Sequence, residues 1–220
     1  PNTQELGFFF EAPLGAPNYP TNPVIGAVFD FPASAHVSVY IGTYLVGNIT
    51  TDTNGFGALP ASATIPAMPA GTYNVVAVDS AMNLVVSPTI GSHTMVISSF
   101  FMAVDPAMNL LTAGNTGSLA PYNNNEYVPQ NGTITVIAYG LTPMSVYNAV
   151  DSAIGPVFPN YVTAVQIGTP YESVGMIPAA NGTLEFSYSP FYGYYGVVTG
   201  TQVLISLSGV PEWNGLSFGY

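Results

Sequence analysis

The stretch Val37-Ser38-Val39-Tyr40-Ile41, residues 37–41, alternates large apolar residues with residues that tolerate solvent. With a period of two, Val37, Val39 and Ile41 share one face of an extended chain, which is the pattern of a half-buried β-strand. A little further on, Asp52-Thr53-Asn54-Gly55 supplies a strong turn signal. Strand patterns separated by turn residues recur along most of the chain.

Further strands are expected wherever this pattern recurs between turn residues. The expected ranges are 24–31, 36–41, 43–50, 71–78, 84–86, 93–104, 133–139, 145–150, 161–167, 183–189 and 201–207. No convincing amphipathic helix interrupts them, and residues 144–154 are the best helical candidate. Many short strands separated by turns predict an all-β sandwich.

The amino-acid composition excludes several classes of binding and catalytic site. The 220 residues include no Lys, no Arg and no Cys, but 11 Asp and Glu and two His, so the net charge is −11 at pH 7. Binding to a phosphate backbone, Walker A chemistry, Schiff bases and arginine fingers all need a cation and are excluded. Disulfides and thiolate sites are excluded by the lack of Cys. No nucleic-acid partner is therefore expected.

The lack of bases suits an acidic exterior. Carboxylates have reference pKa values of about 4, so the chain is nearly uncharged in strong acid and escapes the repulsion that unfolds proteins there. We expect an extracellular protein of an acidic environment, with a low-charge secreted domain as the alternative. No apolar run reaches about 18 residues, so no membrane span is expected. A start at Pro1 without a leader fits a secreted chain whose signal peptide has been removed.

The segment Glu5-Leu6-Gly7-Phe8-Phe9-Phe10-Glu11-Ala12 stands apart from the rest of the chain. Read as a strand, it places Leu6, Phe8 and Phe10 on one face. Prolines recur through residues 13–23 and predict an extended, stiff linker. An apolar strand held off by such a linker is expected to donate itself to a sheet of the next subunit. The alternative is an ordinary first strand of the chain's own sheet.

The predicted organisation has three parts: a donor strand in residues 1–12, a linker in 13–23 and a β-sandwich head in 24–220. Two Ig-like halves of the head, about 24–112 and 130–220, are an alternative. Weak internal repeats bear on this choice, because Ala77–Leu84 is echoed by Ala103–Leu110. We interpret the echo as a turn sequence used twice, with diverged sandwich repeats as the alternative.

Three Asn-X-Ser/Thr sequons, at Asn48, Asn131 and Asn181, are candidate modification sites. None has Pro in the middle, so each is an N-glycan acceptor in a secreted chain. Covalent N-glycans are therefore expected, and no cofactor is.

Metal binding is not predicted. His36 and His93 are far apart, without a second ligand at zinc-type spacing. Asp52-Thr53-Asn54-Gly55 resembles the start of a calcium loop but lacks the downstream Glu, so a turn is preferred.

Catalysis is not predicted either. Glu172, Glu185 and Glu212 are candidates for a glycosidase carboxylate pair, but nothing in their spacing selects a pair. The aromatic run in residues 191–195 is able to stack sugars, although Tyr also packs at interfaces. Trp213 and Phe218-Gly219-Tyr220 are expected to be packing anchors.

Residues 32–80 resemble Ig-like modules of archaeal and bacterial surface proteins. The resemblance is carried by Val37–Ile41, Thr51–Gly55, Pro66 and Pro69–Asp79, and it implies an Ig-like sandwich. The whole profile is also similar to the thread filament subunits of Sulfolobales archaea, through the lack of basic residues, the segment Gly7–Phe10 and the sequons. That resemblance implies a secreted, N-glycosylated protein of an acidophile that polymerises by inserting an N-terminal strand into the next subunit.

Together these features predict an all-β fold, an Ig-like β-sandwich head with an extended N-terminal donor strand. The expected function is structural, not enzymatic: a subunit of an extracellular filament at the cell surface, assembled head-to-tail from identical subunits by donor-strand complementation. It would serve adhesion or biofilm formation, with neighbouring filaments or cell-surface glycans as further partners. An S-layer or adhesin module that binds glycans, an archaeal virus coat protein and a β-sandwich glycosidase are the alternatives.

Overall fold

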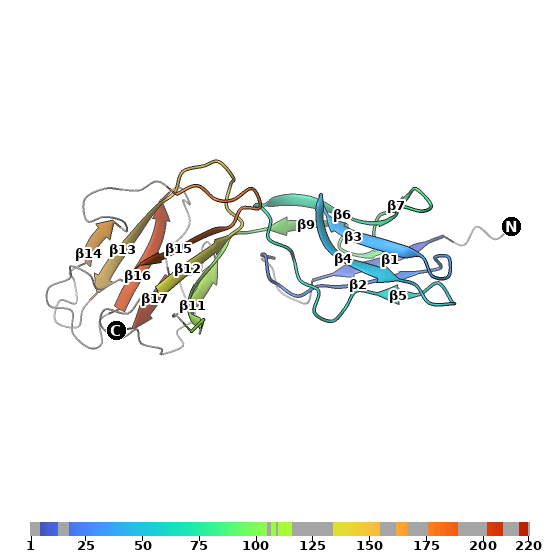
Figure 1. Cartoon of the computed structure of the whole chain (residues 1–220), viewed down its shortest axis with the longest axis horizontal. Coiled ribbons are helices and arrows are strands. Elements are labelled where there is room, and N and C mark those ends of the chain that lie inside the picture. The colour runs from blue at the N-terminus through green and yellow to red at the C-terminus, as the bar shows by residue number, and fades with distance from the viewer. Residues whose placement is uncertain are drawn as a thin grey trace. The chain divides into compact units, whose positions relative to one another are not determined.

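The structure is a computed structural model. It describes residues 5–12, 18–104, 107–108, 110–115, 134–154, 162–166, 176–188, 202–208 and 216–219. Every regular element in these ranges is a β-strand, which confirms the all-β prediction (Figure 1). The same ranges contain no helix suited to crossing a membrane. The chain divides into two compact units, Pro1–Ser98 and Ser99–Tyr220.

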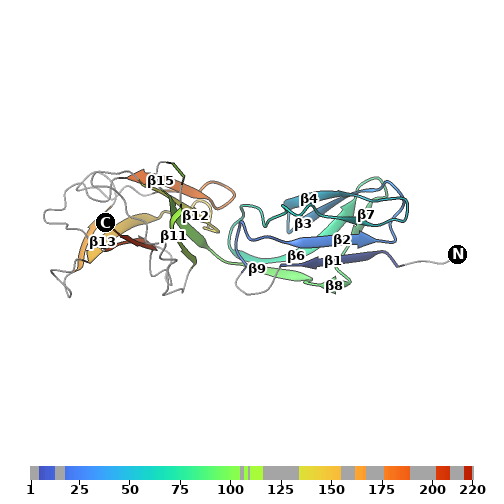
Figure 2. The ribbon, with the colours of Figure 1, turned by 90° about the horizontal axis from the view of Figure 1, so that it is seen from below.

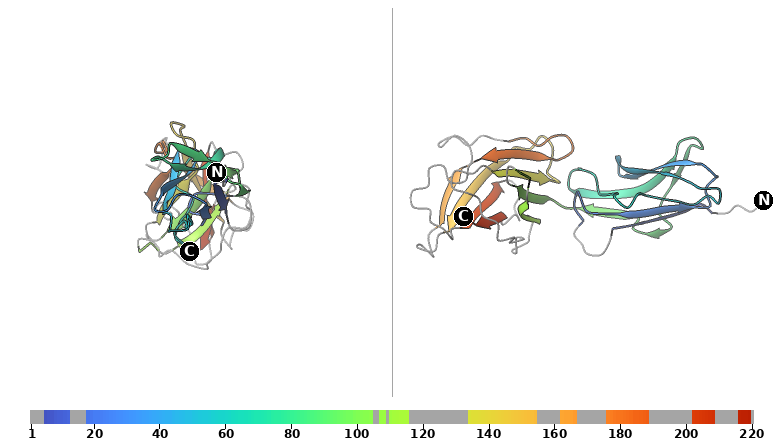
Figure 3. Two further views of the ribbon diagram at one scale, coloured as in Figure 1. Left: turned by 90° about the vertical axis from the view of Figure 1, so that its right-hand side faces the viewer. Right: turned by 60° about the horizontal axis from the view of Figure 1, so that its bottom comes forward.

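The first unit is a sandwich of two sheets, visible from two further sides in Figures 2 and 3. Its strands are β1 (Gly7–Glu11), β2 (Ile25–Phe29), β3 (His36–Ile41), β4 (Tyr44–Thr50), β5 (Gly57–Ala58), β6 (Gly71–Asp79), β7 (Leu84–Val86), β8 (Ile90–Gly91) and β9 (Thr94–Ile97). One sheet has the order β5-β2-β1-β8, and the other has the order β4-β3-β6-β7. β7 and β9 pair with opposite ends of the long strand β6.

The core of this unit lies between the two sheets, where the alternating residues of each strand meet. Val37, Val39 and Ile41 of β3 are buried, as their spacing predicts. Phe8 and Phe10 of β1 join the same cluster. Each large apolar side chain buried in this way contributes roughly 1.5–3 kcal/mol to folding.

The turn after β4 is held by its own first residue. Asp52 Oδ1 accepts hydrogen bonds from the backbone N–H groups of Asn54 (2.7 Å) and Phe56 (3.0 Å). Gly55 adopts φ +78°, and a Cβ there would lie 2.1 Å from the carbonyl oxygen of Phe31. The carboxylate of Asp52 thus forms a turn, and the turn interpretation of this stretch is confirmed.

The structure differs from the predicted ranges at three places. Residues 93–104 do not form one strand, because β9 ends at Ile97 and β10 (Phe100–Val104) begins a different sheet. The division between the two units therefore falls between Ser98 and Ser99 rather than within 112–130. Residues 18–23 are not a free linker, since Asn18 forms a parallel bridge with Ile97 and the N–H of Thr21 bonds Ile65 O at 2.9 Å. Residues 13–17 lie outside the described ranges.

The second unit contains two four-stranded sheets. Its strands are β10, β11 (Leu110–Asn115), β12 (Ile134–Tyr139), β13 (Asn148–Ile154), β14 (Val162–Gln166), β15 (Leu184–Tyr188), β16 (Gln202–Ser208) and β17 (Leu216–Gly219). Their orders are β11-β10-β12-β15 and β14-β13-β16-β17. Residues 144–154, the helical candidate, contain the strand β13 instead of a helix. β13 pairs along one edge with β14 and along the other with β16.

The echoed sequences occupy equivalent positions in two hairpins. Ala77–Leu84 turns β6 into β7, and Ala103–Leu110 joins β10 to β11. In the first hairpin, Asp79 Oδ1 accepts backbone N–H groups from the two residues after Ser80. Asn83 (φ 50°) and Met108 (φ 65°) have left-handed backbones near the ends of the turns. The first copy of the sequence therefore forms a turn. Asp105, Pro106 and Asn109 of the second copy lie outside the described residues, so the use of the same turn twice stays a prediction.

Candidate strand-exchange site

β1 lies in the middle of a sheet of its own unit. It pairs antiparallel with β2, with Phe8 opposite Val28 and Phe10 opposite Gly26. On its other side it pairs in parallel with β8, with Phe10 opposite Gly91. The proposed donor, residues 5–12, therefore fills a position in the first unit of the same chain. Its insertion into another subunit stays a prediction, since the structure contains one chain.

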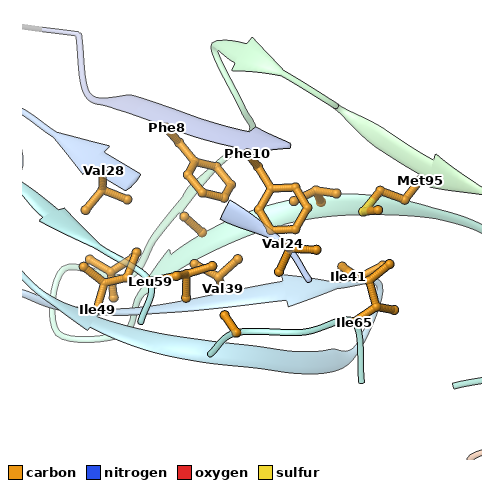
Figure 4. Packing of buried hydrophobic residues seen from close by; sticks show 14 of the residues in the cluster. Phe8, Phe10, Val24, Val28, Val39, Ile41, Ile49, Leu59, Ile65 and Met95 are labelled. Atoms are coloured by element: carbon orange, nitrogen blue, oxygen red, sulfur yellow. The ribbon is translucent and has the colours of Figure 1, made fainter. Parts of the chain in front are cut away.

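The side chains of β1 divide as their spacing predicts. Phe8 and Phe10 are 0% exposed and point from β1 toward the opposite sheet (Figure 4). Their ring centroids lie 6.0 Å apart at an interplanar angle of 52°. Leu6 packs partly buried against the same core, whereas Phe9 is half-buried and Glu11 is exposed on the outer face. The two buried rings anchor the strand.

The main chain of β1 is held by the segment that contains β8. Phe8 O accepts the N–H of Thr89 at 2.7 Å, and Phe10 O accepts the N–H of Ser92 at 2.7 Å. The hydroxyl of Thr89 lies 3.2 Å from both Phe8 N and Phe8 O. Thr89 and Ser92 were not identified from the sequence, because a Thr and a Ser in a turn-like stretch carry no specific signal.

Gly91 permits the close approach of β8 to β1. Its backbone has φ +91°, and a Cβ there would lie 2.1 Å from Phe10 O. On the other side of β1, a Cβ at Gly26 would lie 2.9 Å from Leu59 Cδ1 and 3.3 Å from the Phe10 ring. Glycines on both neighbours thus allow β1 to lie close to them, Gly91 beside the main chain of Phe10 and Gly26 beside its ring.

Two of the three sequons lie in the described ranges. Asn48 is exposed on β4, and its Oδ1 accepts a hydrogen bond from Ser38 Oγ at 2.7 Å. Asn181 is exposed before β15, and its Oδ1 accepts the N–H of Thr183 at 3.1 Å. Asn131 lies outside the described residues. Both described asparagines are accessible to a modifying enzyme, and their glycosylation stays a prediction.

Few of the other polar candidates lie in the described residues, and those that do are apart from one another in the sheets. His36 on β3 has Nδ1 3.2 Å from Thr50 Oγ1, and Glu185 is exposed on β15. The part of the chain that the structure describes contains no group of three or more metal-ligating side chains. The remaining candidates, Glu172, Glu212, Trp213, Tyr220 and the aromatic run 191–195, lie outside the described residues.

Two tyrosines have perturbed ionisation. Burial raises the pKa of Tyr73, and the nearby Tyr44 raises it further. The hydroxyl of Tyr73 donates to Pro69 O at 3.0 Å, and its ring meets Tyr44 edge-on at 6.1 Å. Burial also raises the pKa of Tyr139, with a contribution from the charge of Glu185. Both tyrosines are packing residues rather than members of a titrating cluster.

Similarity to known proteins is found among solved structures and not among family models or curated sequences. No family model matches the chain, and no curated protein matches its sequence. Among solved structures, a tetra-tandem repeat in the extending region of a large adhesion protein matches with a TM-score of 0.28 and 9% identity, over 98% of this chain and 72% of that chain. Fibronectin(III)-like modules of Clostridium thermocellum CbhA match with a TM-score of 0.23 and 14% identity, over 96% of this chain and 90% of that chain. The β-sandwich fold that the sequence predicts rests on the strand order of the sheets themselves.

Proposed function

We propose that this chain is a structural, non-enzymatic subunit of an extracellular filament, whose copies are joined head-to-tail by exchange of β1. The observation that supports the proposal is the position of β1 between β2 and β8. The strand brings two fully buried rings, Phe8 and Phe10, into the core. Only residues 12–17 separate β1 from Asn18, where the chain next pairs with its own unit.

The contacts of β1 do not depend on which copy supplies it. The room beside Gly26 and Gly91 and the N–H groups of Thr89 and Ser92 belong to the receiving unit. A β1 from a second copy would therefore make the same hydrogen bonds and bury the same rings. Exchange of an identical element between copies costs little for this reason. Because giver and receiver are different surfaces, the contact is heterologous, and it extends into an open filament when the rotation between copies does not close a ring.

The composition supports an extracellular place for such a filament. A chain without Lys or Arg loses nearly all of its charge when its 11 carboxylates are protonated. Copies then approach one another in acid without mutual repulsion. We propose that the filament works in adhesion or biofilm formation in an acidic medium, with N-glycans on Asn48, Asn131 and Asn181 supplying hydration that the few charges do not.

A disulfide trap tests the exchange, because the natural chain has no Cys. Phe9 and Ala27 are direct partners across β1 and β2 on the outer face. Their spacing in an antiparallel pair lies within the range that a disulfide bridges. The variant Phe9→Cys/Ala27→Cys is oxidised after assembly at acidic pH and separated on a non-reducing denaturing gel. Exchange predicts a ladder of covalent oligomers, whereas closed monomers give a single monomer band.

Mixing supplies the matched control. Phe9→Cys and Ala27→Cys are made as separate single variants, one with a size tag, and mixed before oxidation. A mixed covalent dimer requires β1 of one chain beside β2 of another. Val85→Cys, on the exposed strand β7, replaces Ala27→Cys in the control mixture. Equal yields of mixed dimer in both mixtures, or only monomers from the double variant, would overturn the proposal.

The second candidate is a surface or adhesin module that functions as a single closed chain. The observation that favours it is the place of β1 in the sheet of its own unit. The same double variant separates the two functions, since a closed module gives only the intramolecular disulfide. A negative-stain image of the native protein at pH 3 gives the independent reading, filaments for exchange and separate particles for the closed module.

A further inference from the structure

The sheet edges of the first unit differ in how they are protected. An open edge presents unpaired N–H and C=O groups, and proteins protect such edges with short strands, prolines, bulges or charges, especially Lys. β5 and β8 have two residues each, β7 has three and β9 has four. Pro60 and Pro88 follow closely after β5 and β7. These edges are too short to pair stably with another chain.

β4 is the exception. Its seven residues, Tyr44–Thr50, contain no charge and no proline. In the described part of the chain, β3 is the only strand that pairs with it. Gly57 of β5 approaches it only near Ile49 and Thr50. Figure 2 places β4 at the margin of its unit, so its outer edge faces away from β3.

The one protective device on β4 is a bulge. The register with β3 shifts between Val39 and Tyr40, so that Gly47 and Leu45 face consecutive residues and Val46 is left over. A bulge twists an edge but does not remove its hydrogen-bonding groups. A chain with no Lys and no Arg also lacks the positive charges that most often protect such a strand.

We propose that β4 is a second assembly site, which pairs antiparallel with β4 of another copy of this chain about a two-fold axis. Antiparallel pairing of identical strands matches each free N–H with a free C=O of the partner. The two four-stranded sheets β4-β3-β6-β7 then form one continuous sheet. Strand addition at an open edge is a common mode of recognition.

A second copy is the occupant that the composition favours. β4 carries no charge, so two β4 strands meet without burying an ion or bringing like charges together. A basic partner strand would find no carboxylate on β4, whereas an identical uncharged strand is self-complementary. The contact is isologous and closes as a dimer, unlike the open series that β1 exchange would give. The two sites together would join filaments side by side.

The sequon at Asn48 lies on this strand, and Asn48 is exposed. A bulky glycan there would stand beside the edge and oppose pairing, so the proposed pairing belongs to copies whose Asn48 carries no glycan. The test therefore uses protein made in a host that adds no glycans. Oligomer mass is measured by sedimentation equilibrium at pH 3 and pH 7, since a net charge of −11 on each copy opposes association at neutral pH.

The variant Leu45→Lys places a charge on β4 at a side chain that is 46% exposed. Its matched control is Val85→Lys, at a 64% exposed position on the short strand β7. A chain that is closed by its own β1 is expected to form a dimer, with a dissociation constant that Leu45→Lys raises about tenfold and Val85→Lys leaves unchanged. Where β1 exchanges instead, the same β4 contact joins filaments in pairs. A dimer that Leu45→Lys leaves intact, or one that both variants weaken equally, would overturn the proposal.

Single cysteines give a second reading that does not depend on a charged variant folding well. Single cysteines are placed in turn at each position of β4, Tyr44 to Thr50. A symmetric antiparallel pair brings one position opposite its own copy, so one of these variants is predicted to form covalent dimers on mild oxidation, and Val85→Cys is predicted to remain monomeric. Failure of every β4 cysteine to cross-link faster than Val85→Cys would overturn the two-fold pairing. Leu45→Lys on β4 is expected to leave the disulfide of the Phe9→Cys/Ala27→Cys variant unchanged. The two tests can therefore fail independently, one for β4 pairing and the other for β1 exchange.

Discussion

Replacing Phe10 by Ala tests whether β1 is part of the core or an accessory to it. Phe10 is 0% exposed and packs in the cluster that joins both sheets of the first unit. Loss of a fully buried Phe costs about 3–5 kcal/mol, because transfer energy is lost and a cavity remains. A domain of this size is stable by about 5–15 kcal/mol in total. Phe10→Ala should therefore remove a large part of the stability of the first unit.

Phe9 supplies the matched control. It is the same residue type on the same strand, but it is half-buried on the outer face of the sheet. Phe9→Ala should cost about 1 kcal/mol or less. The expected difference between the two variants is roughly 2–4 kcal/mol, or about 10 °C or more in the melting temperature of the unit.

Urea unfolding followed by far-ultraviolet circular dichroism measures this difference. The only tryptophan, Trp213, belongs to the second unit. Its fluorescence therefore reports the second unit and should be unchanged in both variants. Equal losses of stability for Phe9→Ala and Phe10→Ala would refute the assignment of faces on β1, and with it the role of the strand as a core element.

Three further predictions follow from named contacts. Gly91→Ala should loosen β1 by about 1–3 kcal/mol, because the new Cβ would meet Phe10 O and the backbone has φ +91°; hydrogen exchange at Phe10 measures it. Thr51→Val should lower the free energy of unfolding by about 1–3 kcal/mol. Thr51 is 4% exposed, and its hydroxyl accepts from Ala35 N at 2.8 Å and donates to Pro32 O at 2.6 Å; thermal unfolding measures the loss. The raised pKa of Tyr73 contributes stability that is fully present below the unfolded pKa of about 10 and is lost as pH rises through the folded pKa. Phenolate absorbance should show late-titrating tyrosines, with one fewer in Tyr73→Phe than in the natural chain.

Strand positions could be predicted where apolar residues that face the core alternate with residues that face solvent. β3 and β7 match their predicted bounds, because apolar residues on β3 face the core and turn residues flank both strands. β5 and β8 were missed, since two residues show no periodicity. β9 and β10 were joined into one strand, because Ser98-Ser99 interrupts the apolar run without a Gly or Pro to mark the change of sheet.

The candidate site could be predicted only from its donor half. The sequence identifies Phe8 and Phe10 as one apolar face, because with a period of two they align with Leu6 and leave Glu5 and Glu11 on the other face. The receiving half comes from Thr89, Gly91 and Ser92, about 80 residues later in the chain. A parallel pairing between distant segments has no local signature, so these residues emerge only once the sheet order is known.

The short segment between β1 and Asn18, residues 12–17, limits how far apart two copies joined by β1 exchange can lie. From Glu11 to Asn18 there are seven residue steps, which span at most about 25 Å when fully extended. Asn18 of one copy must therefore lie within about 25 Å of the Glu11 position in the receiving copy. A longer separation would require residues 18–23 to detach, which breaks the bridge of Asn18 to Ile97 and the hydrogen bond from Thr21 N to Ile65 O.

This limit has a direct consequence for the insertion of residues. Adding a flexible Gly-Ser segment between Ala12 and Asn18 would relax the limit. It would also lower the effective concentration of β1 at its own unit, which the natural segment already reaches. Closure within one chain and exchange between chains bury the same rings, so the balance depends on effective concentration rather than on contacts. We therefore expect insertion of about ten such residues to shift the Phe9→Cys/Ala27→Cys variant from the monomer band toward the ladder. An unchanged ratio of ladder to monomer would mean that the length of this segment does not set the balance between closure and exchange.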